Sequence, residues 1–179
     1  MAGLSWGYNG PVGFLRDGAL SERLPRLAAG MALLPPSKSH VLRVLLVAAA
    51  ARRRVTLSYP ASEGWEGAGD DIRRGFDCAR ALGCEVVVRG GECAVEPVSP
   101  VVAGGALPVG ESGFLGRVAP TCAAMSRRGR WEVEAVGSLK HRLSAPLWEC
   151  LRDAGVDVEV GEGWLSSLEA PDELKRMEL

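Results

Sequence analysis

The chain has 179 residues with 21 basic and 22 acidic side chains, so its formal net charge is −1. This balance argues against a nucleic-acid-binding chain, which would need a strongly basic face. The five cysteines are odd in number and lack CxxC spacing, and with only two histidines they do not favour a zinc site. We interpret them as buried free thiols of a cytoplasmic protein without metal or other cofactor.

The first 30 residues are expected to form a poorly ordered leader. Residues 1–19 are rich in glycine and show no clear hydrophobic period, and residues 1–33 lack the basic start and apolar core of a signal peptide. The longest apolar run, residues 44–51, is too short to span a membrane. We therefore expect no membrane partner.

The segment LPPSKSHVLRV, which begins at residue 34, predicts an anion-binding helix start. Either Ser37 or Ser39 can cap a helix over about 39–51. Pro36 precedes this helix and prevents an upstream helix from running into it. The free N–H groups and the positive end of the helix dipole favour an anion at this end. Lys38 adds a full charge, and Arg43 lies one turn beyond Ser39 on the same side.

The chain then repeats itself. The pattern RV, AA, RR and a strand-like triplet begins at Arg43 and again at Arg117. CARALGCEVVV begins at Cys78, and the similar CLRDAGVDVEV begins at Cys150. The same order at nearly the same spacing indicates a duplicated unit.

Each unit is predicted to have the order βαβαββ, which gives an α/β fold of two tandem units, 31–99 and 100–168. The first unit has a leading strand at 31–34, helices at about 39–51 and 70–82, and strands at 54–59, 85–89 and 92–96. The second has a leading strand at 107–109, helices at about 113–126 and 142–154, and strands at 130–136, 156–160 and 164–168. Gly83 and Gly155 can each end a helix in the left-handed conformation. A charged tail, 169–179, follows.

The first helix of each unit is apolar on all sides, which indicates burial on more than one face. Two units cannot easily close a core around such helices. The sequence therefore implies a third unit or a partner chain.

The second unit repeats the anion-binding features of the first. GESGFLGR places Gly113, where a ligand can approach the backbone closely, at a helix start, with Arg117 four residues later. SLKHR places Lys140 and Arg142 at the predicted start of the next helix. Cations are disfavoured near helix N-termini unless an anion compensates them, so their recurrence there indicates a phosphate or carboxylate ligand. The alternative for any one of them is a solvated surface side chain.

Other ionisable residues are weaker candidates. Asp70 and Asp71 could form an acid pair, but Asp at a helix start more often caps the helix. His40 and His141 each lie near a proposed anion site and could donate a proton, although such a histidine is more often a polar surface residue.

Four segments, in order, resemble motifs of the EPSP synthase (3-phosphoshikimate 1-carboxyvinyltransferase) family, N-terminal portion only. LPPSKSHVLR resembles that family's LPGSKS-x-x-x-R motif, and GDDIRRGFDCARALG resembles its SDD-helix segment. GESGFLGR is similar to its glycine loop, and SLKHRLSAPLWECLRDAG to its R-x-x-x-R-P segment. Together they span residues 34 to 160.

The resemblance implies a domain of three βαβαββ units, of which this chain would hold two. It implies shikimate 3-phosphate and phosphoenolpyruvate as substrates, and enolpyruvyl transfer in aromatic amino acid biosynthesis as the reaction. By position, Lys38, Ser39 and Arg43 match residues that hold shikimate 3-phosphate, and Lys38 also touches phosphoenolpyruvate, which makes it the expected catalytic residue. Gly113 and Arg142 match residues that hold phosphoenolpyruvate, and Arg117 matches the arginine of the glycine loop.

The chain also departs from the family pattern. Phe114 stands where a small or hydroxyl residue is common, and Ser138 where another Arg is frequent. Family chains are more than twice as long, and their second domain carries the catalytic acid and base. We therefore expect a partial transferase that needs a separately encoded remainder or self-association. The alternatives are a non-catalytic anion-binding module or a degenerate remnant of the same fold.

Overall fold

The computed structural model describes residues 5–6, 37–59, 65, 68–98, 104–125, 129–142, 145–161 and 164–171. The elements of the first half are β1 (Ser5–Trp6), α1 (Lys38–Ala51), β2 (Val55–Ser58), α2 (Asp70–Ala81), β3 (Cys84–Arg89) and β4 (Glu92–Pro97). Those of the second half are β5 (Gly105–Gly110), α3 (Leu115–Met125), β6 (Arg130–Ala135), the short 3-10 helix η1 (Gly137–His141), α4 (Ala145–Asp153), β7 (Asp157–Gly161) and β8 (Trp164–Glu169).

Each half builds one four-stranded sheet, and the two sheets have equivalent topology. The strand orders are β1-β2-β4-β3 and β5-β6-β8-β7. In each sheet the first pair of strands is parallel and the others are antiparallel. A helix connects the strands of each parallel pair, because such strands cannot be joined by a tight hairpin. The predicted α/β fold with a repeated βαβαββ order is confirmed.

The first strand of the first sheet comes from an unexpected part of the chain. Ser5 lies opposite Thr56 and Trp6 opposite Leu57, parallel to β2, in the place where the sequence analysis put a leading strand at 31–34. Residues 31–34 lie outside the described residues, as do the remainder of the predicted leader and residues 172–179 of the predicted tail.

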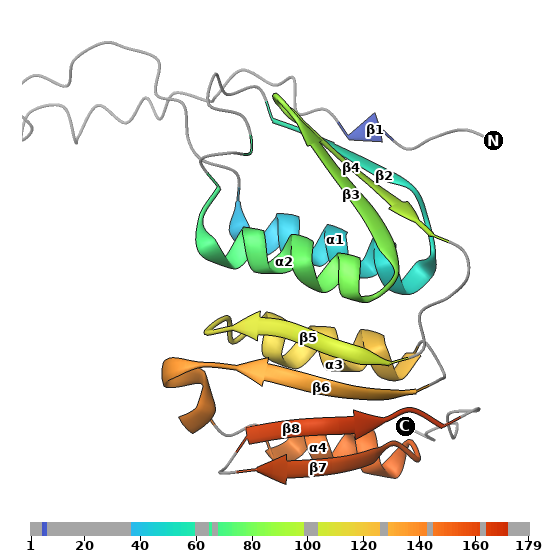
Figure 1. Ribbon diagram of the computed structural model, residues 1–179, viewed down its shortest axis with the longest axis vertical. Coiled ribbons are helices and arrows are strands. Elements are labelled where there is room, and N and C mark those ends of the chain that lie inside the picture. Colours follow the sequence, from blue (N-terminus) through green and yellow to red (C-terminus); the bar gives the residue numbers. More distant parts are fainter. Residues whose placement is uncertain are drawn as a thin grey trace, which may run out of the picture.

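The helix pair of the first half lies between its own sheet and the second half (Figure 1). On one side α2 packs against β3, and on the other side it packs against β5, while α1 packs against α3. Gly75 lets α2 approach α1 closely, since a Cβ there would collide with Leu42. Where α1 meets α3, Cys122 Sγ lies 3.7 Å from the Leu46 carbonyl oxygen. One face of each helix of the first half is therefore buried.

Two glycines follow helix ends, as the sequence predicts. Gly83 and Gly155 follow α2 and α4 with φ angles of 84° and 91°. Residues other than glycine rarely adopt this left-handed backbone conformation. The two glycines therefore allow the chain to turn from helix to strand.

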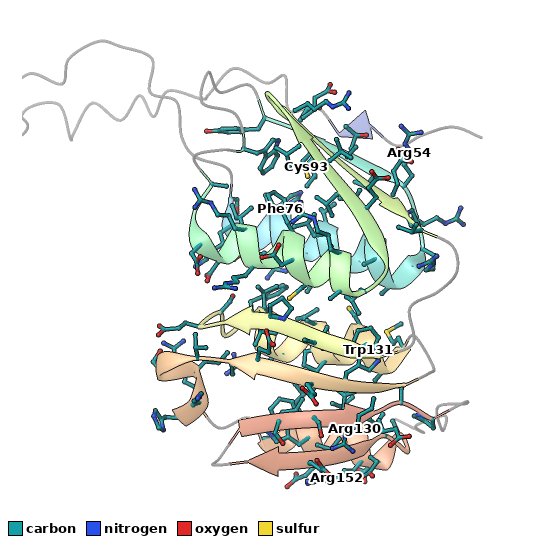
Figure 2. All side chains as sticks on the ribbon, in the orientation of Figure 1. Arg54, Phe76, Cys93, Arg130, Trp131 and Arg152 are labelled. Atoms are coloured by element: carbon teal, nitrogen blue, oxygen red, sulfur yellow. The ribbon has the colours of Figure 1, made fainter. Side chains whose placement is uncertain are left out.

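Four of the five cysteines are buried, as expected, but Cys150 on α4 is exposed, which corrects the prediction for that residue. The first turns of α4 leave Cys150 on its solvent face, while Trp148 and Leu151 face the core. Burial raises the pKa of Cys78 to about 12 and that of Cys93 to about 11. Figure 2 shows Cys93 and Phe76 in the layer between α2 and the first sheet.

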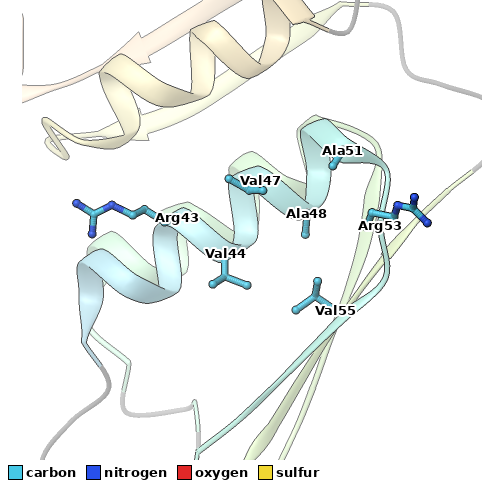
Figure 3. A pocket seen from close by; sticks show the side chains of 7 residues that line it. All are labelled: Arg43, Val44, Val47, Ala48, Ala51, Arg53 and Val55. Atoms are coloured by element: carbon cyan, nitrogen blue, oxygen red, sulfur yellow. The ribbon is translucent and has the colours of Figure 1, made fainter. Parts of the chain in front are cut away.

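The outer face of α1 is partly apolar and exposed. Val47 is 62% exposed, and it borders a shallow depression of about 280 Å³ between α1 and the start of β2 (Figure 3). The depression is lined by Arg43, Val44, Val47, Ala48, Ala51, Arg53 and Val55. The described residues thus leave an apolar strip on this helix partly exposed.

Among the helices that the structure describes, none has both the length and the apolar character needed to cross a membrane.

Replacing Leu46 with Ala is expected to lower the free energy of unfolding by about 2–5 kcal/mol, because its fully buried side chain would leave a cavity between α1 and α3. The matched variant is Val47→Ala on the same helix, which should change stability by no more than about 0.5 kcal/mol. Urea unfolding followed by circular dichroism measures both. Equal losses for the two variants would contradict the packing described.

Cys150 is expected to be the only one of the five cysteines that reacts rapidly with a thiol reagent at pH 8 in the folded protein. The buried thiols of Cys78, Cys93 and Cys122 have pKa values of about 12, 11 and 11, so they stay protonated at that pH, and the thiolate is the reactive form. Labelling and mass spectrometry of native and urea-unfolded protein test this. Rapid native labelling of Cys93 would refute it.

Candidate anion-binding site

The two anion-binding segments predicted from the sequence meet in one cavity of about 530 Å³. It is lined by Lys38, Ser39, Leu42, Asp71, Glu111, Ser112, Gly113, Phe114, Arg117 and Arg142. Because α1 and α3 pack side by side, their N-terminal ends open on the same space. The structure thus joins two predicted sites into one.

At the start of α1, Lys38 forms an ion pair with Asp71 of α2, with 2.7 Å between Nζ and Oδ2. The lysine side chain remains 60% exposed, so its charge is still accessible to a ligand. Ser37 occupies the N-cap position, but its side chain makes no capping hydrogen bond, which corrects the expected role. Neither Asp70 nor Asp71 takes the N-cap position of α2, because Gly69 holds it, which corrects the expected capping role.

The glycine loop before α3 brings two guanidinium groups together. The position of a Cβ on Gly113 would lie 3.1 Å from Arg117 Nη1 and 3.5 Å from Arg142 Nη1. Arg117 Nη1 also donates a hydrogen bond of 2.7 Å to the Gly113 carbonyl oxygen. A side chain here would crowd Arg117, whose guanidinium would have to shift slightly, whereas its contact with Arg142 would be an ordinary one.

Arg142 reaches the cavity from a different local structure than predicted. Residues 137–141 form the 3-10 helix η1, Arg142 follows it, and α4 begins only at Ala145. A helix starting at Arg142 would need the N–H of residue 146 to bond the Arg142 carbonyl, and Pro146 has no N–H. Arg142 Nη2 instead donates to Ser138 Oγ at 2.9 Å, so Ser138 positions the guanidinium.

Arg43 is the predicted site residue that does not line the cavity. Its Nη1 donates to the Ser39 carbonyl oxygen at 3.2 Å, and its Cζ lies 5.4 Å from the centre of the Phe114 ring. That distance is typical of a cation–π contact. Arg43 and Ser39 lie on one side of the helix, as predicted. The Arg43 guanidinium contacts the Phe114 ring, however, and does not line the cavity.

Of the weaker candidates, Lys140, His40 and His141 are exposed and do not line the cavity. Asp71, which was considered only as part of an acid pair or as a helix cap, does line the cavity, and so does Glu111, for which no role was predicted. Asp71 pairs with Lys38 because α1 and α2 are packed together. The position of Asp71 in the sequence does not indicate this packing.

The cavity is suited to a phosphate or carboxylate. Lys38, Arg117 and Arg142 present three positive charges, and two of these charges approach the same point beside Gly113. An anion between the guanidinium groups relieves their repulsion and accepts hydrogen bonds from both. Among the described residues, no group of three or more His, Cys, Asp or Glu side chains could hold a metal ion.

The chain is similar in sequence and in fold to known proteins. The chain is 29% identical over 139 residues to the 3-phosphoshikimate 1-carboxyvinyltransferase 2 of Halalkalibacterium halodurans, a match that covers 78% of this chain and 29% of that protein. It superposes on an EPSP synthase from Acinetobacter baumannii with a TM-score of 0.62 at 19% identity, over 83% of this chain and 33% of that chain. The chain resembles EPSP synthases in sequence and in fold.

The EPSP synthase-like fold covers only part of those proteins, because the chain spans about a third of their length. The enolpyruvyl transferase NikO from Streptomyces tendae also aligns, at 17% identity and a TM-score of 0.40 over 73% of this chain and 30% of that chain. No protein-family profile matches the chain.

Replacing Gly113 with Ala is expected to weaken binding of inorganic phosphate by roughly threefold, since the added methyl group would lie 3.1 Å from Arg117 Nη1 and would force that guanidinium to shift. Gly161→Ala on β7 is the matched control, because a Cβ there meets only an ordinary contact with Ser166. Isothermal titration calorimetry gives the affinities. Unchanged affinity in the Gly113 variant would show that the position of Arg117 beside Gly113 does not contribute to anion binding.

Proposed function

We propose that this chain forms part of an enolpyruvyl transferase and binds phosphoenolpyruvate and shikimate 3-phosphate at the cavity between α1 and α3. The observation that carries the proposal is the convergence of Lys38, Arg117 and Arg142 on one cavity beside Gly113. Both substrates are phosphorylated and carry a carboxylate, so they match a site built from cations. The similarity to 3-phosphoshikimate 1-carboxyvinyltransferase 2 supports this choice of substrates.

The residues divide between the two substrates. Lys38 and Ser39, at the start of α1, hold shikimate 3-phosphate, and Lys38, which lines the same cavity as the arginines, also contacts phosphoenolpyruvate and acts in catalysis. Gly113, Arg117 and Arg142 hold the carboxylate or phosphate of phosphoenolpyruvate. Arg43 contributes to shikimate 3-phosphate binding only if it leaves its contact with Phe114.

Transfer itself needs more than these groups. A hydroxyl oxygen adds to the enol carbon, the methylene carbon gains a proton, and phosphate and a proton then leave. This sequence requires an acid and a base besides the anion-binding cations. Neither carboxylate of the cavity is well placed for both roles, because Asp71 is paired with Lys38 and Glu111 packs over Gly137.

A remainder therefore completes the active site and supplies the acid and base. The exposed apolar strip around Val47 on α1 is the surface that such a remainder would cover, either as a separate chain or as a further copy of this one. In this proposal the chain works in the cytoplasm, in aromatic amino acid biosynthesis.

Calorimetric titration with phosphoenolpyruvate and with shikimate 3-phosphate tests the proposed binding. Arg142→Ala is expected to weaken binding of phosphoenolpyruvate about tenfold, as removal of one charged hydrogen-bonding partner does. Arg89→Ala, at the exposed end of β3, is the matched control and should leave the affinity unchanged. If neither substrate binds the native chain, or if both variants bind alike, the proposal is wrong.

Turnover is tested separately by measuring phosphate release with both substrates present. The chain alone is expected to release none, because it lacks an acid and base in position. Release by the purified chain alone would contradict the need for a remainder. Tight binding of both substrates without release, even after a matching remainder is added, would favour a non-catalytic anion-binding module.

A further inference from the structure

Phe114 contacts both the anion cavity and Arg43. Its side chain lines the anion cavity, and its ring also carries the guanidinium of Arg43, with 5.4 Å from Cζ to the ring centre. The residue directly before it is Gly113, against which Arg117 and Arg142 converge. One aromatic ring therefore stands at the boundary between Arg43 and the other cations.

Arg43 is close to the cavity without being part of it. Ser39, one turn earlier on α1, lines the cavity, and Arg43 Nη1 donates to the Ser39 carbonyl oxygen. Figure 3 shows the guanidinium pointing away from Val55, toward the N-terminal end of α1, where it meets the Ser39 carbonyl oxygen and the Phe114 ring. Its charge is thus taken up by a carbonyl oxygen and an aromatic face.

We propose that Phe114 is a specificity-determining residue that holds Arg43 out of the anion cavity. The cavity then binds its anion through Lys38, Arg117 and Arg142 alone and takes a small phosphate or carboxylate. Loss of the ring lets Arg43 turn inward and adds a fourth cation, which favours larger or more highly charged phosphate esters. This inference rests on the anion site of the proposed function.

Arg43 could exchange its contact with the Phe114 ring for a contact with a bound phosphate. A cation–π contact at an exposed site biases a side chain by only about two- to fivefold. A charge-assisted bond from a guanidinium to a phosphate is stronger than that contact. The bulk of the ring must therefore contribute, by standing in the path that Arg43 would take into the cavity.

Inorganic phosphate is the probe for the test, with affinities from calorimetry. Phe114→Ala is expected to raise the phosphate affinity about fivefold, whereas the double variant Phe114→Ala, Arg43→Ala should return to within twofold of the native value. Phe114→Tyr keeps the ring and should also stay within twofold. Arg43→Ala alone should do the same, in contrast to the loss caused by Arg142→Ala.

A second measurement needs no gain in affinity. In nitrogen-15 NMR spectra, added phosphate should shift the side-chain signal of Arg142 and leave that of Arg43 in place in the native chain. In Phe114→Val, which removes the ring and most of its bulk but keeps an apolar side chain and so guards against loss of folding in the Ala variant, phosphate should shift both signals.

The outcomes separate the two proposals. If native phosphate binding depends on Arg142 but Phe114→Ala does not raise it, the role of Phe114 is refuted and the anion site stands. If Arg43→Ala weakens binding as strongly as Arg142→Ala, Arg43 already acts in the cavity and the inference is wrong. If neither the native chain nor the Phe114 variants bind phosphate, both proposals fail.

Discussion

The structure depends on the packing of α1 against α3. These are the two helices that begin at the anion-binding segments, and they are buried against each other through Leu46 and Cys122. Since both helices start at the same end of this contact, their free N–H groups and nearby cations open on one cavity. Without this contact the molecule would present two weak, separate cationic turns.

The packing of α1 against α3 brings positive charges close together, and other groups of the site partly compensate for them. Lys38 and Arg117 lie in the first turns of α1 and α3, where the helix dipole disfavours cations. Asp71 neutralises part of this charge through its ion pair with Lys38, and Ser138 and the Gly113 carbonyl hold the guanidinium groups. The remaining positive charge is what a phosphate or carboxylate would meet. Phe114 limits that charge by engaging Arg43.

Most of the fold could be predicted from the sequence. Hydrophobic periodicity, the repeated motifs and the glycines at helix ends indicated the βαβαββ order, and the resemblance to EPSP synthases agreed with it. The errors have local causes. Pro146 delays the start of α4, so that Arg142 follows a 3-10 helix. Ser5 and Trp6 pair with β2 from far away in the chain, and no local pattern signals such a pairing.

For the candidate site, the sequence by itself determined the kinds of residue: Lys38, Ser39, Gly113, Arg117 and Arg142 could be chosen because cations and glycine recur at helix starts. Only the tertiary structure decided which of them share a cavity. The distances that join Lys38 to Asp71, and that place Arg43 over Phe114, cross between helices. Such contacts depend on how helices pack, and residues far apart in sequence carry no local signal of it.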